Sequence, residues 1–142
     1  MVRLIKPEKV LPLRSQVLRN GIPLEQCVFP TDQLGFHLGA QDGTGKIVSV
    51  ASFFAEDYPD RAEGGFRLRG MASDPDFAGK GHGAELVKFA IDKLRSDNAS
   101  YIWCSARLVA VGFYAKLGFE IVSDEFEIPG IGPHFNMLIE LK

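Results

Sequence analysis

Apolar residues recur along this chain with two kinds of spacing, and these spacings predict its secondary structure. Strict alternation is typical of a strand with one buried face, whereas spacings of three and four are typical of a helix that buries one stripe. The clearest helix carries Val87, Ala90, Ile91 and Leu94 at positions i, i+3, i+4 and i+7. We therefore expect a helix that starts shortly after residue 80 and packs this stripe against a core.

The clearest pair of strands lies earlier in the chain. The segments "FHLGAQ" (36–41) and "IVSVASFFAE" (47–56) flank the turn sequence "DGTGK", which predicts a hairpin. Similar patterns predict the remaining elements: strands at 2–6, 66–73, 101–105, 119–128 and 134–141, and helices at 8–19 and 107–118. A strand, a helix and a further strand in the middle of this order require a crossover and at least one parallel pair. The expected class is α/β or α+β around one mixed sheet.

Composition narrows the class of protein. The 142 residues suit a single domain spanning 1–142, and 46% hydrophobic with 24% charged residues is typical of a globular protein. The net charge of 16 − 18 = −2 offers no basic field for nucleic acid, and no apolar run is long enough for a membrane span. Cys27 and Cys104 are far apart and in no metal-binding spacing, so we expect reduced thiols, no metal and a cytoplasmic location.

The stretch "DFAGKGHGAEL" (76–86) is the main candidate for a binding site. Gly79, Gly81 and Gly83 lie between a predicted strand and a predicted helix. Glycine tolerates positive φ and lets the backbone approach a ligand closely, and the first N–H groups of a helix have no internal partner. Together these features favour an anion site. The glycines alone fit a tight turn equally well.

Two nucleotide-binding motifs fail at this stretch. A P-loop needs a glycine five positions before its Gly-Lys pair, and Asp74 stands there, while Gly81 follows Lys80 where Ser or Thr is required. The dinucleotide pattern G-x-G-x-x-G/A does match at Gly79, Gly81 and Ala84. It also needs an acidic residue near the end of the next strand, and that strand ends "WCSAR".

A third interpretation is a family resemblance. The segment "MASDPDFAGKGHGAELV" (71–87) resembles the acetyl-CoA pyrophosphate loop of the GNAT superfamily of N-acyltransferases, with Ala78 where that family has Arg or Gln. The segment "AVGFYAKLGFE" (110–120) resembles the second family signature, and "WCSAR" (103–107) resembles the "WCNAR" of some members. The likeness covers nearly the whole chain and is weakest over residues 7–34. Neither motif is specific alone, but the two in this order are a strong signal.

The resemblance implies where the donor would bind. Backbone N–H groups of the loop would hold the CoA pyrophosphate, and the strand before it would pair with the pantetheine arm, with an N–H of Met71 or Ala72 polarising the thioester carbonyl. A β-bulge near 70–72 would open a slot for the arm. The implied cofactor-binding residues are Met71, Ala72, Ser73, Gly79, Lys80, Gly81, His82, Gly83 and Ala84.

The resemblance also assigns Tyr114 as the catalytic acid that protonates the departing thiolate, and no general base is evident. Strand parity places Arg67 and Arg69 on one side, which suggests an acceptor with a carboxylate or phosphate, against the alternative of an exposed strand face. Arg69, His37 and His134 are the candidate substrate-binding residues, and both histidines and Glu56 are also candidate bases. Cys104, inside an apolar strand without a neighbouring histidine, is expected to be a buried thiol.

The resulting prediction is an acetyl-CoA-dependent N-acetyltransferase. It would move an acetyl group to a primary amine of a small molecule or peptide by direct attack in a ternary complex, without a metal, nucleic acid or membrane partner. A homodimer is compatible with the resemblance. The alternative is a non-catalytic acyl-CoA-binding or sensing module on the same fold, suggested by Ala78 and by the missing base; a nucleotide-dependent oxidoreductase is a distant third.

Overall fold

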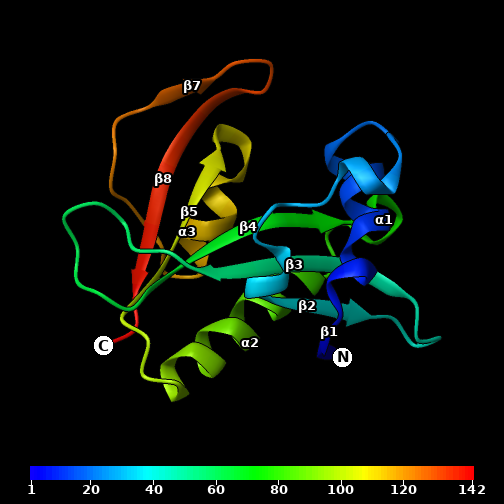
Figure 1. The fold of residues 1–142 in the computed structure, drawn as a ribbon, viewed down its shortest axis with the longest axis horizontal. Coiled ribbons are helices and arrows are strands. Elements are labelled where there is room, and N and C mark those ends of the chain that lie inside the picture. The colour runs from blue at the N-terminus through cyan, green and yellow to red at the C-terminus, as the bar shows by residue number, and fades with distance from the viewer. The chain divides into compact units, whose positions relative to one another are not determined.

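The computed structural model describes all residues from Met1 to Lys142 (Figure 1). Eight strands and three α-helices follow one another along the chain, joined by short 3-10 and π-helical turns. The strands are β1 (Val2–Ile5), β2 (Phe36–Gln41), β3 (Ile47–Ala55), β4 (Gly65–Ser73), β5 (Tyr101–Arg107), β6 (Glu120–Ile121), β7 (Phe126–Ile128) and β8 (Gly132–Glu140). The helices are α1 (Leu11–Leu13), α2 (His82–Ser96) and α3 (Val111–Lys116).

The chain forms two compact units. The first comprises Met1–Phe54 and Leu68–Ala90, and the second comprises Ala55–Arg67 and Ile91–Lys142. Strand β4 and helix α2 therefore contribute residues to both units. The single domain expected for residues 1–142 stays a prediction.

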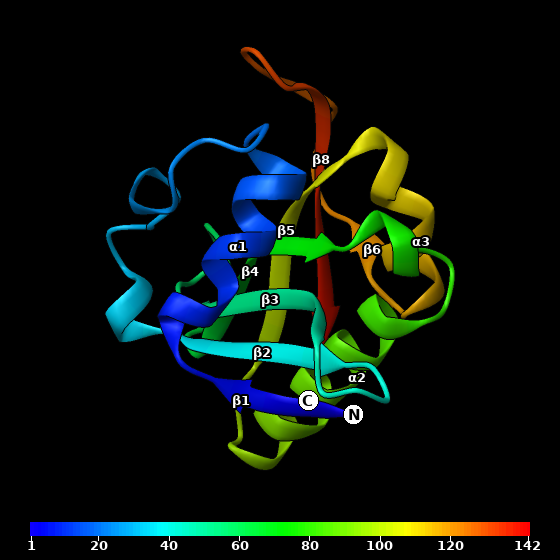
Figure 2. The same ribbon diagram turned by 90° about the vertical axis from the view of Figure 1, so that its right-hand side faces the viewer.

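In the first unit, β1, β2 and β3 pair antiparallel, and β3 neighbours β4. The β2–β3 turn forms as predicted, because the Asp42 carboxylate accepts hydrogen bonds from the backbone and hydroxyl of Thr44 and from the Lys46 amide. Helix α1 lies across β3 (Figure 2), and the contact is apolar. Its buried members are Val10, Leu13, Val50 and Ala72.

The first helical region differs from the expected continuous helix at 8–19. A 3-10 turn at Pro7–Val10 leads into α1, and a π-helical segment follows at Arg14–Leu18. Pro12 explains the change, because its ring would clash with the carbonyl of Glu8 in a regular α-helix and it has no N–H to donate. The chain then leaves the helix through Gly21, which has a φ of +79°.

In the second unit, the start of β4 pairs in parallel with β5, through Gly65↔Tyr101 to Arg67↔Trp103. Strand β5 pairs antiparallel with β8 along the whole length of β5, and β6 and β7 both pair with β8. Figure 1 shows β5 and β8 side by side, with α3 next to them. One parallel pair among antiparallel pairs confirms the predicted mixed sheet of an α/β fold.

The single strand expected at 119–128 is wrong, because the structure divides it into β6 and β7. Ser123 causes the break. Its hydroxyl accepts a hydrogen bond from the Asn136 amide at 2.9 Å, where a strand would offer a backbone carbonyl. Val122 still donates its amide to the Asn136 carbonyl, so β8 stays partnered across the interruption.

Candidate active site

The predicted glycine loop connects β4 to α2 in the first unit. A 3-10 turn at Pro75–Phe77 is capped by Asp74, whose carboxylate accepts a hydrogen bond from the Asp76 amide at 3.0 Å. Gly79 and Gly81 then take φ values of +77° and +83°, and a Cβ on either would meet nothing within 4 Å. These glycines are therefore required by their backbone conformation and not by crowding.

Helix α2 starts at His82, and its first interior hydrogen bond runs from the Glu85 amide to the Gly81 carbonyl. The N–H groups of Gly79–Ala84 precede that bond and have no backbone acceptor. Gly79, Lys80 and Gly81 are exposed, so the row is open to an incoming anion. Behind it, the stripe predicted from the sequence is confirmed as buried at Val87, Ala90, Ile91 and Leu94.

Two lysines bring positive charge to this loop. The Lys80 ammonium lies 5.2 Å and the Lys46 ammonium 5.5 Å from the centroid of the Phe77 ring, and Lys46 also approaches the Asp74 carboxylate at 3.4 Å. Ala78, in the place of the family's Arg or Gln, adds no charge. Lys46 was not predicted as a site residue, because it lies in the β2–β3 turn, more than thirty residues before the loop.

His82, the first residue of α2, is half-buried. Its ring meets Phe77 edge-on at 6.2 Å, and its Nδ1 atom is buried without a hydrogen-bond partner. A buried nitrogen without a partner is uncommon in folded proteins. His82 therefore keeps one unused hydrogen-bonding atom at the start of the helix.

The end of β4 places Met71, Ala72 and Ser73 just before the loop. Ala72 is buried against α1, and the Ser73 hydroxyl shares a 2.7 Å hydrogen bond with the Ser49 hydroxyl. The side chains of Ala72 and Ser73 are thus engaged within the protein, so a ligand would meet these two residues through their backbone. Gly70, one residue earlier, has a φ of +67°, a local departure from strand geometry where a bulge is expected.

A buried ion pair lies beside Gly70. Arg14 donates from Nη1 and Nη2 to the two carboxylate oxygens of Asp32, at 2.8 and 2.9 Å, and both side chains are almost fully buried. A Cβ on Gly70 would lie 3.1 Å from Arg14 Nε, which has no partner. Burial raises the pKa of Asp32, but the hydrogen bonds from Arg14 and from the Phe29 amide outweigh it and hold that pKa below 3.8.

His37 belongs to this same cluster. Its Nε2 atom lies 2.9 Å from the Asp32 carbonyl oxygen, so it donates there, and Nδ1 lies 2.6 Å from the Ser52 hydroxyl. That hydroxyl also accepts a hydrogen bond from Arg14 Nη2 at 2.9 Å, which ties His37 to the buried ion pair. Both nitrogens of His37 are engaged inside the protein, which leaves neither for an acceptor in this arrangement.

The two arginines of β4 contact different aromatic rings. The Arg69 guanidinium lies over the Phe29 ring at 4.4 Å, and Arg14 approaches the same ring at 3.7 Å. Arg67, which belongs to the second unit, lies over Trp103 at 4.5 Å. Arg69 thus lies beside the buried ion pair in the first unit.

Tyr114 lies in α3 of the second unit and is 5% exposed. Its ring packs against Phe113 and Phe119, with centroids 5.0 and 5.4 Å apart, and its hydroxyl makes no hydrogen bond to another group of the protein. Burial, and secondarily the neighbouring Cys104, raise the pKa of Tyr114 above its ordinary value. The hydroxyl therefore stays protonated and keeps a proton that it can donate.

Cys104 is buried as predicted, and burial raises the pKa of its thiol to about 12. The thiolate needed for nucleophilic attack is therefore scarce at neutral pH. His134 is also buried, and its Nδ1 atom lies 2.8 Å from the Gly132 carbonyl oxygen while its ring stacks on Phe126 at 5.9 Å. Glu56 lies on the surface and pairs with Arg67.

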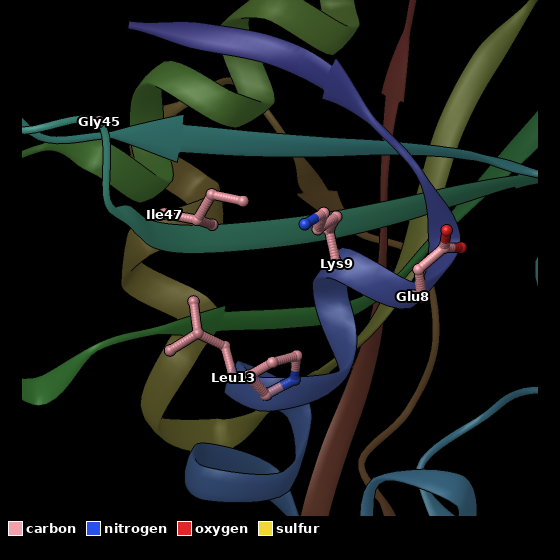
Figure 3. Close-up of a pocket in the computed structure, with 6 residues that line it drawn as sticks. Glu8, Lys9, Leu13, Gly45 and Ile47 are labelled. Atoms are coloured by element: carbon pink, nitrogen blue, oxygen red, sulfur yellow. The ribbon is translucent and has the colours of Figure 1, made fainter.

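A surface hollow of about 450 Å³ lies in the first unit between the start of the helical region and β3. Figure 3 shows Leu13 and Ile47 facing this space from α1 and β3. None of the site residues predicted from the sequence lines it. Its mixture of apolar side chains with Glu8 and Lys9 points to no particular chemistry.

The structure thus groups the predicted residues in two sets. Every predicted cofactor-binding residue, together with Arg69 and His37, belongs to the first unit, and Tyr114 and His134 belong to the second. No three His, Cys, Asp or Glu side chains are grouped so that they could hold a metal ion. No helix has both the length and the apolar character needed to cross a membrane.

Comparison with known proteins defines the class. A Bacillus subtilis (strain 168) relative, the uncharacterized N-acetyltransferase YitI, is 37% identical over 145 residues, which cover 99% of this chain and 96% of the relative. An aminoglycoside 6'-N-acetyltransferase complexed with coenzyme A has a TM-score of 0.79 at 13% identity, over 100% of this chain and 97% of the other. The Escherichia coli GNAT protein YhbS, in complex with CoA, has a TM-score of 0.75 at 17% identity, over 100% and 81%.

The solved structures show that this chain has the fold of these two CoA-bound acetyltransferases, and the Bacillus subtilis relative extends the likeness to the sequence. The Acetyltransferase (GNAT) family profile matches residues 8–119, and the chain belongs to this family. It is an N-acetyltransferase whose acyl donor is acetyl-CoA. The row of free amides in Gly79–Ala84 fits the diphosphate of that donor.

Proposed function

We propose that this enzyme transfers the acetyl group of acetyl-CoA to a primary amine of a small molecule or peptide, by direct attack in a ternary complex. The observation that carries the proposal is the open row of N–H groups in Gly79–Ala84 at the start of α2, built on two glycines with positive φ. Such a row binds a diphosphate through backbone donors and the positive end of the helix. The nearby Lys46 and Lys80 supplement the charge that Ala78 does not supply.

The reaction exchanges one bond for another. The amine nitrogen forms a bond to the thioester carbon, the carbon–sulfur bond breaks, the amine loses a proton and the sulfur gains one. Acetyl-CoA supplies an acyl group activated as a thioester. We propose that an N–H of Met71 or Ala72 donates a hydrogen bond to the carbonyl oxygen, and that the Tyr114 hydroxyl donates a proton to the sulfur.

The proton of the amine needs an acceptor other than the two predicted histidines. His37 has both nitrogens engaged with Asp32 and Ser52, and His134 is buried with its Nδ1 atom 2.8 Å from the Gly132 carbonyl oxygen. We propose that bulk or bound water removes this proton, so positioning contributes more to the rate than basic catalysis does.

The two free, buried cysteines support a proposal that the protein acts in the reducing cytoplasm. We also propose that the protein forms a homodimer. Analytical ultracentrifugation would measure this oligomeric state directly.

One experiment tests the proposed function against its alternative. The melting temperature is measured with acetyl-CoA, CoA and NAD, and CoA release is then followed with a panel of primary amines. Acetyl-CoA at about 100 times its Kd should stabilise the fold by about 2.7 kcal/mol, a shift of roughly 5–10 °C. Stabilisation without turnover of any amine would favour a sensor, and no response to either form of CoA would contradict both functions.

A substitution in the loop should weaken donor binding specifically. Gly81→Val places a β-branched side chain at a φ of +83°, which such residues avoid at a cost of about 1–2 kcal/mol, so the row of amides must shift. We expect the Kd for acetyl-CoA, measured by calorimetry, to rise about tenfold or more. Gly43→Ala, in an open turn without positive φ, is the matched control and should leave the Kd unchanged.

Cys104 offers a test of direct attack. Because burial holds the pKa of its thiol at about 12, it should form no acyl-enzyme, and Cys104→Ala should retain kcat within about twofold. Mass spectrometry of the wild-type enzyme mixed with acetyl-CoA should show no acetylated Cys104. A stoichiometric acetyl adduct on this residue would replace direct attack with a two-step transfer.

A further inference from the structure

The Arg67 guanidinium lies over the ring of Trp103 in the second unit. It lies 4.5 Å from the centre of that ring, and the Trp103 side chain is buried. The Trp103 Nε1 atom donates a hydrogen bond to the Glu56 carbonyl at 2.9 Å, which fixes the orientation of the ring. Stacking on a fixed aromatic ring limits the rotation of the guanidinium plane and prepares it for a planar or tetrahedral oxyanion.

The hydrogen bonds that Arg67 makes within the protein are long. Nη1 lies 3.3 Å from one Glu56 oxygen and Nη2 lies 3.5 Å from the Ser105 hydroxyl, whereas charge-assisted N–H···O bonds are typically about 2.7–2.9 Å. Its Nε atom is buried and has no partner. An approaching oxyanion would therefore meet the terminal Nη1 and Nη2 atoms, whose present partners hold them weakly.

Arg14 provides an internal comparison. Its Nε atom is also buried without a partner, but its Nη1 and Nη2 atoms bind both oxygens of Asp32 at 2.8 and 2.9 Å. Both terminal nitrogens of Arg14 thus bind one buried carboxylate, whereas in Arg67 only Nη1 contacts a carboxylate, that of Glu56, at 3.3 Å. Arg14 therefore serves the fold, whereas the terminal nitrogens of Arg67 make only long hydrogen bonds and can still bind a ligand.

We infer that Arg67 binds an oxyanion, a carboxylate or a phosphate, carried by the amine acceptor. This inference rests on the proposed function and names the substrate class of the same reaction. The oxyanion would bind end-on to Nη1 and Nη2, as Asp32 binds Arg14, and would displace Glu56. Displacement is cheap because the Glu56 side chain is 46% exposed, and a solvated carboxylate pairs weakly.

The other polar groups around Arg67 are neutral and paired with one another. The Ser105 hydroxyl donates to the Asn136 side-chain oxygen at 2.7 Å, and the Asn136 side-chain nitrogen donates to the Tyr58 hydroxyl at 3.2 Å. Glu56 is thus the only carboxylate that contacts Arg67. Apart from Glu56, nothing in contact with Arg67 repels an incoming oxyanion.

Trp103 reports on this site directly, because it is the only tryptophan of the chain. We would titrate the protein with two matched probe pairs at constant ionic strength: 6-aminohexanoate against hexylamine, and phosphoethanolamine against ethanolamine. An oxyanion bound to Arg67 should change the Trp103 fluorescence saturably, and the amine without the anionic group should not. The two pairs distinguish a carboxylate from a phosphate. No saturable change with either anionic probe at millimolar concentration would overturn the inference.

Three variants make the result specific. Arg67→Gln should weaken the anionic probes about 10- to 100-fold, because a charge-assisted fork is lost. Glu56→Gln should instead bind them more tightly, by roughly threefold, since the competing carboxylate is gone. Arg61→Gln breaks an exposed pair with Glu140 elsewhere in the same unit and should leave the binding of both anionic probes unchanged. Unchanged probe binding in both Arg67→Gln and Glu56→Gln would overturn the inference even if one variant is unstable.

Turnover separates this inference from the proposed function. Among the amines that are acetylated, the wild-type enzyme should prefer the anionic member of each pair. Arg67→Gln should raise the KM for that anionic amine about tenfold or more, with little change in kcat. The shift in melting temperature produced by acetyl-CoA should be the same in wild type and in Arg67→Gln. Loss of that shift in wild type would contradict the proposed function, whereas turnover without an anionic preference would contradict only the role of Arg67.

Discussion

Replacing Asp32 with alanine is expected to lower the free energy of unfolding by about 3–5 kcal/mol and the melting temperature by roughly 10–15 °C. The change leaves the Arg14 guanidinium buried with its carboxylate removed, and the Phe29 amide loses its acceptor. An uncompensated buried charge costs far more than the pair is worth to the fold. Urea unfolding followed by circular dichroism measures the effect.

The matched control is the exposed pair between Arg61 and Glu140, at 3.2 Å. Glu140→Ala should cost about 1 kcal/mol or less, because water already solvates both charges. The double variant Arg14→Met with Asp32→Leu should recover part of the loss from Asp32→Ala, since no buried charge then remains. A cost for Asp32→Ala as small as that for Glu140→Ala would contradict the assigned role of the pair.

The same carboxyl group predicts a dependence of stability on pH. The pKa of Asp32 is lower in the folded protein than its unfolded value of 3.8, so the folded state binds its proton less readily. Its contribution is therefore complete above about pH 5 and is lost as pH falls below 3.8 through the folded pKa. In Asp32→Asn this component should be missing, so the difference in unfolding free energy between wild type and variant should shrink on acidification.

Elements with a local signal could be predicted from the sequence. The β2–β3 hairpin follows from alternation on both sides of a turn that Asp42 closes with its own side chain, and α2 follows from the stripe of Val87, Ala90, Ile91 and Leu94. The glycine loop follows likewise, because positive φ at Gly79 and Gly81 is a property of single residues. In each case the physical cause lies within a few positions of the residues that show it.

The cluster around Arg14 could not be predicted, because its members lie far apart in the chain and resemble surface residues. Arg14 and Asp32 are eighteen positions apart, and Ser52 twenty more. Charged side chains are ordinarily exposed, and only their joint burial against β2 and β3 reveals the pairing. The sequence predicts His37 as a substrate-binding residue for the same reason. Its two partners, the Ser52 hydroxyl and the Asp32 carbonyl, are apparent only in the folded structure.

Replacing Tyr114 with phenylalanine is expected to lower kcat about 100-fold while changing the Kd for acetyl-CoA less than about threefold. General acids typically contribute about 10²–10⁴, and the raised pKa of this tyrosine makes it a weak acid, which places the effect at the lower end. The hydroxyl has no hydrogen-bond partner within the protein, so its removal should leave the melting temperature nearly unchanged. Steady-state kinetics, with chemistry shown to limit the rate, measures the loss.

Tyr101 is the matched control, because it is a buried tyrosine with the opposite arrangement. Its hydroxyl donates to the Ala62 carbonyl at 3.0 Å and accepts from the Tyr58 amide at 2.8 Å. Tyr101→Phe should therefore lower the free energy of unfolding by about 1–3 kcal/mol and leave kcat nearly intact. The two variants together separate a hydroxyl that serves the fold from one that serves the reaction.

The pH profile gives an independent measure of the same group. A donor must be protonated to act, and activity that depends on Tyr114 is lost only as pH rises through its pKa. Since burial raises that pKa above 10.0, no alkaline loss of kcat due to Tyr114 is expected below about pH 10. A falling limb near pH 8–9 that disappears in Tyr114→Phe would show that the hydroxyl ionises far more easily than its burial allows, and an unchanged kcat in that variant would remove Tyr114 from the reaction.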